Sequence, residues 1–318
     1  MQAVTIVIPN YNGKALLENC IKTLEKQTRK DFKVLVIDNG STDGSVLLSS
    51  DILDMEMVAL AENTGFCRAV NIGIEKTETE FVILLNNDTE AEPEFVAELL
   101  RGIETDETIF SCGAQMIDYR NHSILDNAGD LYTAFGWALA RGKGKSLQKY
   151  SEECNVFSCC AGAAIYRVDA LRKVGYLDEC HFAYLEDVDL GYRGRIYGYK
   201  NRYLPKARVY HVGSATTGTR YNEKKVFLAA RNTIYVIYKN MPMLQLVINM
   251  PFILLGIIVK TLFFTKKGFG KEYLYGICDG LKECRKCKKV VFRWKNLKHY
   301  FRIQIELWVN IMRILLAK

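Results

Sequence analysis

The sequence predicts an α/β protein with a mostly parallel central sheet flanked by helices. Three short apolar runs have the length and β-branched composition of strands that are buried on both faces: 4–8, 33–37 and 81–85. Segments with apolar residues at helical spacing lie between these runs. Strand–helix–strand alternation of this kind is typical of a parallel sheet with crossover helices, so the first hundred residues set the fold class.

Each expected element has its own pattern. The first helix is expected over 15–24 and the second over 66–74, because apolar residues recur there every three or four positions. The third is expected from Pro93, a residue suited to the first turn of a helix, to about Gly102. Farther along, a helix is expected to begin near Glu186, and extended segments are expected at 109–117, 156–168 and 203–210.

Composition and length favour one large globular domain with an appendage. The chain has 318 residues, of which 49% are hydrophobic and 25% charged, and only five are proline. The N-terminus lacks the basic and apolar regions of a secretory signal, so the ten cysteines are expected to be unpaired thiols in a reducing compartment. The pair Cys284 and Cys287 has no second pair to complete four zinc ligands, and free thiols are favoured there.

Positive charge is concentrated at the C-terminal end. From Lys260 onward there are 15 Lys and Arg residues against 4 Asp and Glu, a net charge of +11, whereas the preceding residues carry −4. A segregated basic segment suggests binding to an anionic surface, either a membrane or a nucleic acid. The strongly apolar sequence beside these charges favours lipid, so an anionic membrane surface is the expected partner and nucleic acid is not.

Residues 240–318 are expected to form a basic, amphipathic, membrane-associating helical region behind a catalytic domain at 1–239. Residues 240–259 contain no charge and are long enough to cross a bilayer, but prolines and polar residues interrupt them. A single crossing would also put the basic tail on the opposite side from the catalytic domain, against the positive-inside tendency. Peripheral or re-entrant attachment to the inner face of the cell membrane is therefore expected; a buried core helix or a spanning helix are the alternatives.

The final apolar segment, 299–317, has one polar stripe. Its polar members recur at helical spacing: Arg302, Glu306, Asn310 and Arg313. This composition is that of an interfacial amphipathic helix.

Polar residues follow each of the three predicted parallel strands. They are 9–12 after the first strand, 38–44 after the second and 86–89 after the third. Any one of these clusters could be ordinary turn chemistry, since Asn, Asp and Gly favour turns. The carboxyl ends of parallel strands share one sheet edge, however, and ligands bind at such edges. The three clusters are therefore expected to meet at one cleft.

Carboxylates in the chain suggest two kinds of chemistry. Asp88, with Asn86 two residues before it, is placed to bind Mg²⁺ or Mn²⁺, although an Asp that opens a turn is the alternative. Glu186 and Asp187 follow an apolar segment and could deprotonate a hydroxyl, although an acidic helix start is the alternative. His211, after an extended run, is a second candidate metal ligand.

Seven stretches carry a resemblance to a known family. They are VTIVIPNYNG (4–13), VLVIDNGSTDGS (34–45), ENTGFCRAVNIGI (62–74), FVILLNNDT (81–89), SCCAGAAIYRVDAL (158–171), VGYLDECHFAYLEDVDLGYR (174–193) and GYKNRYLPKARVYHVG (198–213). In this order and spacing, the chain resembles family 2 glycosyltransferases with the GT-A fold, especially the bacterial rhamnosyltransferase-like branch. The resemblance covers roughly residues 4–240.

The resemblance implies roles for particular residues. Asn86-Asn87-Asp88 matches the family's metal-binding DxD position with Asn in place of the first acid, which leaves Asp88 as the main ligand. His211 matches a histidine that completes the metal site, and Arg231-Asn232 matches a pair of less certain role. The implied nucleotide-binding residues are Pro9, Asn10, Tyr11, Asp38, Asn39, Asn63, Gly65, Asn71 and Asn87, with Phe66 in the same pocket.

The resemblance also implies an inverting sugar transfer from a dTDP- or UDP-sugar to a glycan, for example one linked to a polyprenyl diphosphate. Asp187 matches the acid taken as the base, beside Glu186, and the metal is held by Asp88, His211 and Asn86. Together these features predict a metal-dependent, membrane-associated transferase of cell-surface polysaccharide synthesis.

Other enzyme classes fit the sequence poorly. A nucleotidyltransferase needs a Gly-rich, Arg-containing loop where this chain has PNYNG, and no GxGxxG follows a strand as a dinucleotide oxidoreductase requires. A processive synthase needs QxxRW, but Val290 stands where the glutamine would precede Arg293-Trp294. The remaining alternative is a non-enzymatic protein that binds membranes or nucleic acid through the basic tail.

Overall fold

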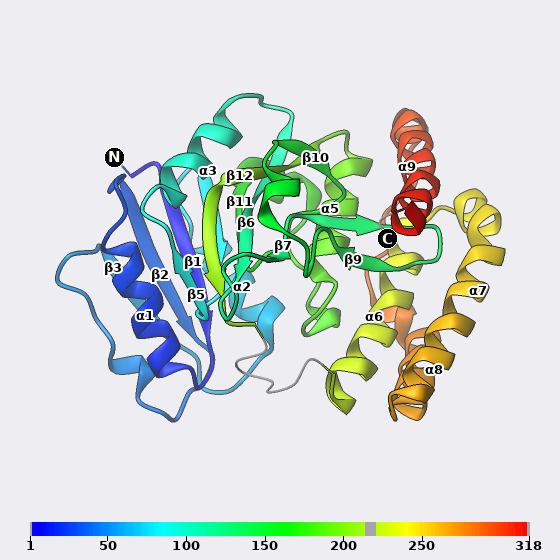
Figure 1. Ribbon diagram of the computed structural model, residues 1–318, viewed down its shortest axis with the longest axis horizontal. Helices are drawn as coiled ribbons and strands as arrows, with labels where there is room; N and C mark the ends of the chain where they lie inside the picture. Colours follow the sequence, from blue (N-terminus) through cyan, green and yellow to red (C-terminus); the bar gives the residue numbers. More distant parts are fainter. Residues whose placement is uncertain (1, 214–220, 317–318) are drawn as a thin grey trace.

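The computed structural model describes residues 2–213 and 221–316, and these form one mixed sheet covered by helices (Figure 1). The main path through the sheet is β10-β12-β6-β11-β4-β1-β2-β3, with β5 on β12 and β7 on β6. The strands are β1 (Val4–Asn10), β2 (Phe32–Asp38), β3 (Met55–Ala59), β4 (Phe81–Leu85), β5 (Thr89–Ala91), β6 (Ile109–Asp118), β7 (Leu125–Asn127), β10 (Cys154–Val156), β11 (Ala163–Arg167) and β12 (Lys200–His211).

Parallel pairing joins β1 to its neighbours β2 and β4, and joins β2 to β3. The middle of the sheet changes direction at β11, which runs antiparallel to both β4 and β6. Beyond it, β12 pairs with β6 in parallel and ends beside β5. This arrangement brings the end of β12 next to the segment that follows β4, although more than a hundred residues separate them in sequence.

Helices cover both faces of the sheet. On one face α1 (Lys14–Leu24) and α3 (Phe95–Glu104) bury their apolar residues against β1, β4 and β6. On the other, α2 (Phe66–Glu75), α4 (Val168–Val174) and α5 (Glu186–Ile196) do the same. Successive residues of β1 point to opposite faces, so Ile6 and Ile8 join one core and Val7 the other.

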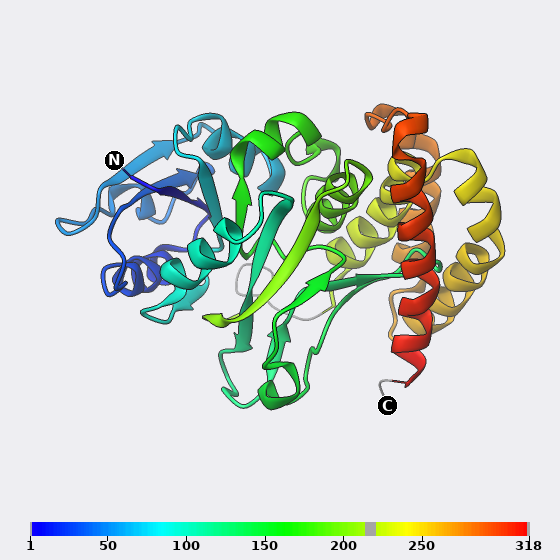
Figure 2. The ribbon, with the colours of Figure 1, turned by 90° about the horizontal axis from the view of Figure 1, so that it is seen from above.

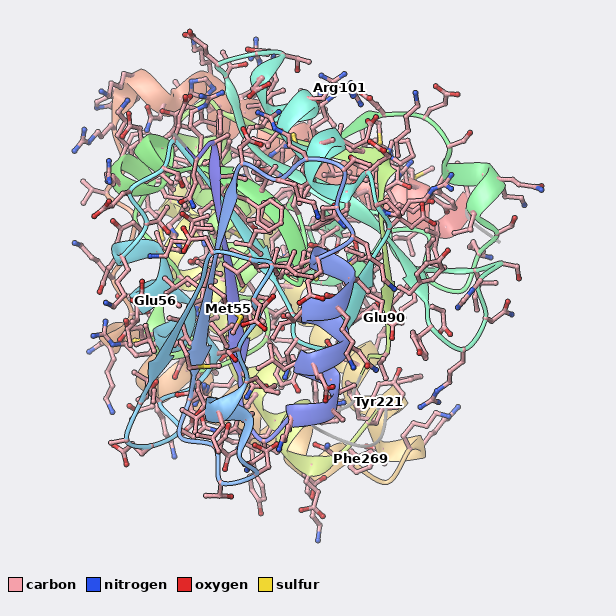
Figure 3. The ribbon with its side chains drawn as sticks, turned by 90° about the vertical axis from the view of Figure 1, so that its left-hand side faces the viewer. Met55, Glu56, Glu90, Arg101, Tyr221 and Phe269 are labelled. Carbon is pink, nitrogen blue, oxygen red and sulfur yellow. The ribbon has the colours of Figure 1, made fainter. Side chains whose placement is uncertain are left out.

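The predicted fold class is confirmed, with small differences at the element boundaries. The three predicted parallel strands are β1, β2 and β4, and the predicted early helices are α1, α2 and α3. The prediction that α3 begins at Pro93 is wrong by two residues, because its first residue is Phe95. The strand β3 was not predicted; it forms the edge of the sheet, where Met55 and Glu56 lie in Figure 3, and its side chains are only partly buried.

Four C-terminal helices pack beside the sheet, at the end far from β3 in Figures 1 and 2. They are α6 (Glu223–Asn240), α7 (Met243–Lys266), α8 (Gly270–Glu283) and α9 (Leu297–Leu316). The expected division between 239 and 240 falls at the end of α6. The small hairpin of β8 (Asp130–Tyr132) and β9 (Ala138–Ala140) reaches from the sheet to these helices, and its Phe135 contacts Phe252 of α7.

The helix α7 has its polar side chains turned toward the protein. Only four of its residues are buried: Gln245, Asn249, Ile253 and Gly256. Most of its large apolar residues are exposed, so α7 is not a core helix of this chain. By length and composition it is the single helix among the described residues that could cross a membrane, with a mean hydropathy of 2.2.

Candidate active site

A cavity of about 580 Å³ lies at the carboxyl ends of β1, β2 and β4. Its wall is completed by the ends of β8, β9 and β12, by the loop before α5 and by two residues of α6. Most of the sequence-predicted site residues line it together: Pro9, Asn10, Tyr11, Asn39, Asn63, Asn86, Asn87, Asp88, Glu186, Asp187 and His211. Three predicted residues do not line it: Asp38, Gly65 and Asn71.

Hydrogen bonds join the three strand ends into one network. The amide of Asn10, at the end of β1, donates to Asp38 Oδ2 of β2 over 3.0 Å. Its carbonyl oxygen accepts from Asn87 Nδ2, after β4, over 2.7 Å. Burial disfavours the charge on Asp38, but hydrogen bonds from Ser41, Asn10 and Ser45 outweigh it and hold the pKa of this carboxyl below its ordinary value. The floor of the cavity is therefore preorganised.

A second network fixes the wall between β2 and α2. Asn39 donates to Asn63 Oδ1 over 3.1 Å and to the Gly65 carbonyl over 3.2 Å. Gly65 has a φ of +91°, and a β-carbon there would lie 2.6 Å from the ring of Phe182. Only glycine satisfies both the backbone angle and the close approach. Gly65 thus lets the loop before α5 pack onto the start of α2, which explains its place beside the cavity.

Asn71 has a different setting from the one expected. Its amide donates to the Leu177 carbonyl over 2.9 Å and to Glu179 Oε1 over 3.0 Å, and its oxygen accepts from the Leu177 amide over 3.1 Å. These bonds tie α2 to the segment that leads into the loop before α5. In the described residues Asn71 therefore supports the cavity wall from behind.

Two of the three predicted metal ligands, Asp88 and His211, lie next to each other, and the third, Asn86, lines the same cavity. His211 Nε2 lies 3.3 Å from Asp88 Oδ1, and His211 Nδ1 lies 2.8 Å from Asp126 Oδ2. Burial opposes a charged imidazole, but the hydrogen bonds to Asp126 and Asp88 raise the pKa of His211 to about 9. A carboxylate oxygen and an imidazole nitrogen that face one cavity suit Mn²⁺ or Mg²⁺, and a carboxylate behind the imidazole is a common way to orient such a ligand. The residues present therefore fit a divalent cation.

Three carboxylates share the opposite wall. Glu186 and Asp187 open α5, and Asp130 approaches them from β8. Burial, and next the nearby Asp187 charge, raise the pKa of both Glu186 and Asp130 to about 8, and burial also raises that of Asp187. Glu186 Oε2 is buried without a hydrogen-bond partner in the described residues. This cluster can hold and release protons near neutral pH.

The loop before α5 is strained and is clamped from α6. Phe182, Tyr184 and Leu185 all have positive φ angles, between 62° and 73°, which is costly for residues with side chains. Asn232 of α6 donates to the carbonyls of His181, Ala183 and Tyr184, over 3.0, 2.8 and 2.7 Å. The sequence marked Arg231-Asn232 without a clear role. In the structure the pair holds this loop, since Arg231 also donates to the carbonyls of Cys180 and His181.

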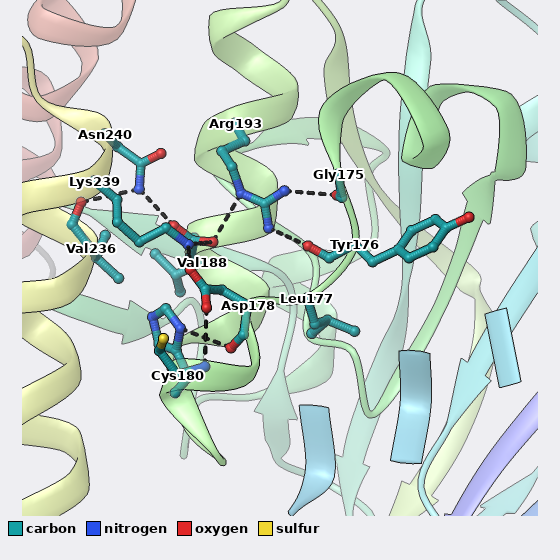
Figure 4. A network of polar contacts seen from close by, with 12 residues as sticks. Gly175, Tyr176, Leu177, Asp178, Cys180, Val188, Arg193, Val236, Lys239 and Asn240 are labelled. Carbon is teal, nitrogen blue, oxygen red and sulfur yellow. Dashed lines mark hydrogen bonds and ion pairs between the residues drawn. The ribbon is translucent and has the colours of Figure 1, made fainter. Parts of the chain in front are cut away.

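A buried ionic network lies just beyond the acid pair (Figure 4). The Asp189 carboxylate accepts from Lys239 Nζ over 2.8 Å, from Asn240 Nδ2 over 2.8 Å and from Arg193 Nε over 2.9 Å. Burial would disfavour its charge, yet the nearby Lys239 and Arg193 lower the pKa of Asp189. Lys239 also pairs with Asp178. The network fixes α5 to the end of α6. It therefore also holds the acid pair, Glu186 and Asp187, in the first turn of α5.

One further group of metal-binding residue types lies outside the cavity wall. The ligand atoms of Asp178, Cys180 and Cys287 lie within 4.8 Å of one another. The carboxylate of Asp178 is already paired with the Lys239 ammonium. The sequence analysis considered zinc only at Cys284 and Cys287 and favoured free thiols there. In the structure, Cys287 lies near Cys180 and Asp178.

Two residues of the site were missed in the sequence. Asp126 and Asp130 stand four positions apart in a segment of short strands, and their local sequence resembles an ordinary turn. The only signal in the sequence was the presence of two acids close together. Their role depends on contacts with His211 and with the acid pair, which lie far along the chain.

Comparison with known proteins agrees with this geometry. The family described as "Glycosyl transferase family 2" matches residues 5–175. An N-acetylglucosaminyl-diphospho-decaprenol L-rhamnosyltransferase of Mycobacterium tuberculosis is 25% identical over 265 residues, which cover 72% of this chain and 84% of that protein. Other relatives are matched over a smaller part of their length. A teichoic acid poly(glycerol phosphate) polymerase of Staphylococcus epidermidis is 30% identical over 95 residues, which cover 28% of this chain and 13% of that protein.

Solved structures share the fold at low sequence identity. The structure of S. aureus TarS in complex with UDP-GlcNAc superposes with a TM-score of 0.60 at 15% identity, covering 96% of this chain and 90% of that one. A mannosyltransferase of Pyrobaculum calidifontis in complex with GDP-Man and Mn²⁺ gives a TM-score of 0.55 at 13% identity, covering 99% and 88%. At these identities the likeness supports the fold alone.

Proposed function

Because this chain belongs to glycosyl transferase family 2, we propose that it transfers a sugar from a nucleotide diphosphate to a hydroxyl of a glycan acceptor, with inversion at the anomeric carbon. One observation carries the proposal. A single cavity has a cation-binding pair, Asp88 and His211, on one wall and an acid pair, Glu186 and Asp187, on another. A sugar diphosphate requires both a site for the phosphates and a proton acceptor for the attacking hydroxyl.

The donor nucleotide is expected at the carboxyl ends of β1 and β2. The linked side chains of Asn10, Asp38 and Asn87 hold that wall in place, and Asn39, Asn63 and Tyr11 present polar atoms around it. We propose a dTDP- or UDP-sugar, with rhamnose or a hexose as the transferred group. The similarity to a mycobacterial protein named as a rhamnosyltransferase supports rhamnose as the transferred group.

Asp88, His211 and Asn86 are the residues proposed to hold Mg²⁺ or Mn²⁺. When bound, such a cation supplies positive charge against the diphosphate that leaves. In the structure His211 is held toward Asp88 by Asp126, so the two ligands need little rearrangement. The solved mannosyltransferase that shares this fold is described as a complex with Mn²⁺, so Mn²⁺ is the first cation to test.

Asp187 is proposed as the base. Its carboxylate accepts from the amides of Val188 and Ala161, over 2.8 and 3.4 Å, which fixes its position at the start of α5. The proton of the acceptor hydroxyl passes to Asp187 as the oxygen attacks the anomeric carbon. Glu186 and Asp130 are held with raised pKa values beside it, so at neutral pH they keep protons and limit repulsion around the ionised base.

The acceptor is proposed to be lipid-linked, with the enzyme attached peripherally to the cytoplasmic face of the cell membrane. Two features support this. The exposed surfaces of α7 and α9 are apolar, and the basic excess of the C-terminal segment matches the anionic headgroups of an inner leaflet. The β8–β9 hairpin connects this face with the cavity, because Leu139 lines the cavity and Trp137 donates to the Gly256 carbonyl of α7 over 3.3 Å.

Replacing the base tests the proposal directly. We expect Asp187→Asn to lower nucleoside diphosphate release from dTDP-, UDP- or GDP-sugars with Mn²⁺ by about 10³-fold or more, because it removes the carboxylate proposed to take the proton of the acceptor hydroxyl. Donor binding, measured as the rise in melting temperature with the same nucleotide sugars, should stay nearly unchanged.

A matched control is Asp169→Asn, which removes an exposed carboxylate from α4, outside the cavity wall. It should retain normal release. Near-normal turnover by Asp187→Asn would exclude Asp187 as the base. If the unaltered protein neither binds nor consumes any of these donors, the non-enzymatic alternative would take its place.

A further inference from the structure

A second, smaller cavity lies on the flank of the molecule, away from the cavity described above. Its volume is about 260 Å³, and it is formed where the end of α5 and the start of β12 meet the first turns of α9. Four basic side chains and one acid are on its wall: Arg195, Lys200, His299, Arg302 and Glu306. No residue of this wall takes part in the proposed sugar transfer.

The charges of this cavity are only partly balanced. Glu306 pairs with Arg195, and Lys200 pairs with Asp106 over 2.9 Å. Arg195 Nε is nevertheless buried without a hydrogen-bond partner in the described residues. Arg302 makes no hydrogen bond or ion pair with any described residue. A buried donor and an unpaired guanidinium on one cavity wall leave a deficit of negative charge and of acceptor oxygens.

The surroundings of the cavity identify the kind of anion. Phe301 and Ile305 of α9 are exposed on either side of Arg302 in sequence, and Trp308 and Met312 continue the same apolar surface along the helix. A ligand that fills the cavity would therefore hold its anionic group beside an apolar surface. Phospholipids have this construction, since their phosphate adjoins acyl chains.

We propose that this cavity binds the phosphate of an anionic phospholipid headgroup, through Arg302 and Arg195. The inference deepens the proposed membrane attachment and rests on it. The phosphate oxygens would accept charge-assisted hydrogen bonds from the Arg302 guanidinium, and the positive charge of Arg195 lies on the same cavity wall. The cavity is large enough for a phosphate with its glycerol, and the exposed aromatic and aliphatic side chains of α9 would contact the acyl region.

A second copy of this chain is a poorer occupant of the same surface. It would bring the same excess of positive charge, +11 over the last 59 residues, to a face that already lacks negative charge. An anionic bilayer supplies charge of the opposite sign together with an apolar layer.

Vesicle binding by the full chain tests the proposal. Affinity is measured for phosphatidylcholine vesicles with and without one third phosphatidylglycerol, for the unaltered protein, Arg302→Gln and Lys298→Gln. Lys298 is the matched control, an exposed cation one turn away on α9 that does not line the cavity. Loss of any single surface cation weakens binding to anionic vesicles about fivefold. Loss of a charge-assisted contact in the cavity should weaken it about 30-fold.

The outcomes separate the site from the attachment. A loss for Arg302→Gln several times that for Lys298→Gln, confined to vesicles with phosphatidylglycerol and partly rescued in Arg302→Lys, supports the site. Equal losses for the two variants would reduce the effect to diffuse charge and overturn the proposal. Failure of the unaltered protein to bind either kind of vesicle would overturn the attachment and the site together. Nucleotide release in detergent should be the same in all variants, so sugar transfer is assessed separately.

Discussion

The helices that cover the sheet and two helices of the C-terminal end, α7 and α9, differ in which residues they bury and which they expose. In α1 the buried residues are apolar, Leu17, Cys20, Ile21 and Leu24, and its charged residues face water. In α7 and α9 the buried set includes polar residues, Gln245, Asn249, Gln304 and Asn310, and the exposed set is largely apolar. Both arrangements have helical periodicity. In α1 the apolar side faces the protein, whereas in α7 and α9 the side that faces the protein carries polar residues and most of the apolar residues face outward.

The polar contacts of α7 and α9 explain why this arrangement is stable. The amides of Asn249 and Gln304 bond each other reciprocally, each over 2.8 Å, and Gln245 accepts from the Tyr192 hydroxyl over 2.8 Å. Asn310 donates to the Tyr132 carbonyl over 2.8 Å. These helices are therefore held to the protein by hydrogen bonds as well as by a few buried apolar residues, Ile253, Ile303 and Leu307, while their other apolar residues are exposed. Burial of apolar side chains accounts for the packing of α1, but the packing of α7 and α9 also depends on hydrogen bonds between buried amides.

A matched pair of substitutions gives the largest expected effect. Leu17→Asp places a charge in the fully buried core under α1 and should lower the free energy of unfolding by about 4 kcal/mol or more. Leu255→Asp places the same charge on the outer face of α7, where the side chain is 51% exposed, and should change stability in detergent by less than about 0.5 kcal/mol. Chemical denaturation measures both.

Vesicle flotation is the complementary readout for that pair. Leu255→Asp should weaken membrane binding, because it puts a charge into the apolar surface. If instead Leu255→Asp destabilises the protein as Leu17→Asp does, the exposed face of α7 is covered by protein in solution, and the comparison between the two regions fails.

The reciprocal amide pair gives an intermediate effect. Asn249→Ala leaves Gln304 buried without its partner and should cost about 1–3 kcal/mol. Replacing both with leucine should cost less than the sum of the single replacements, because no unpaired amide remains. A double-mutant cycle in urea measures the coupling. Additive effects would show that the pair does not hold α7 to α9.

The buried acids of the cavity and of the Asp189 network also differ, and the prediction from this difference is the smallest of the three. Between α5 and α6, Asp189 is neutralised by Lys239 and Arg193. In the cavity, Asp130, Glu186 and Asp187 form no ion pair with a Lys or Arg of residues 2–213 and 221–316, and burial raises the pKa of each. Because their pKa values are raised, activity should increase with pH as the base ionises. Burial and the Asp187 charge raise the pKa of Asp130 to about 8, so at neutral pH Asp130→Asn removes no charge and should shift that rise by less than about half a pH unit. The pH profile of kcat/KM measures the shift, and a rise about one pH unit lower in the variant would show that Asp130 is charged while the base ionises.

Much of the sheet could be predicted because its strands have strong local signals. The runs at β1, β2 and β4 lie in the interior of the sheet, so nearly all of their residues are apolar, with Thr5 and Lys33 as exceptions, and the predicted boundaries are nearly right. The edge strand β3 was missed because a half-exposed strand has no such run. The polar stripe of α9 was found, but periodicity does not tell which side faces the protein, and Glu306 and Asn310 of that stripe point inward.

The site shows the same limit. Asp88 follows β4 and His211 is the last residue of β12, and the pairing of β12 with β5 brings the two together, so residue type and position were enough to suggest them. Asp126 and Asp130 carry no local mark, and the clamp by Asn232 depends on how α6 crosses the loop before α5.

The grip of α6 on both flanks of the acid pair restricts how such an enzyme could be recombined with others. Asn232 holds the segment before Glu186, and Lys239 and Asn240 hold Asp189 just after Asp187. A chimaera that exchanged the whole C-terminal part for that of another protein would remove these contacts to the acid pair even with the sheet untouched. Exchange is expected to succeed only where the junction follows Asn240, so that the exchanged part begins at α7.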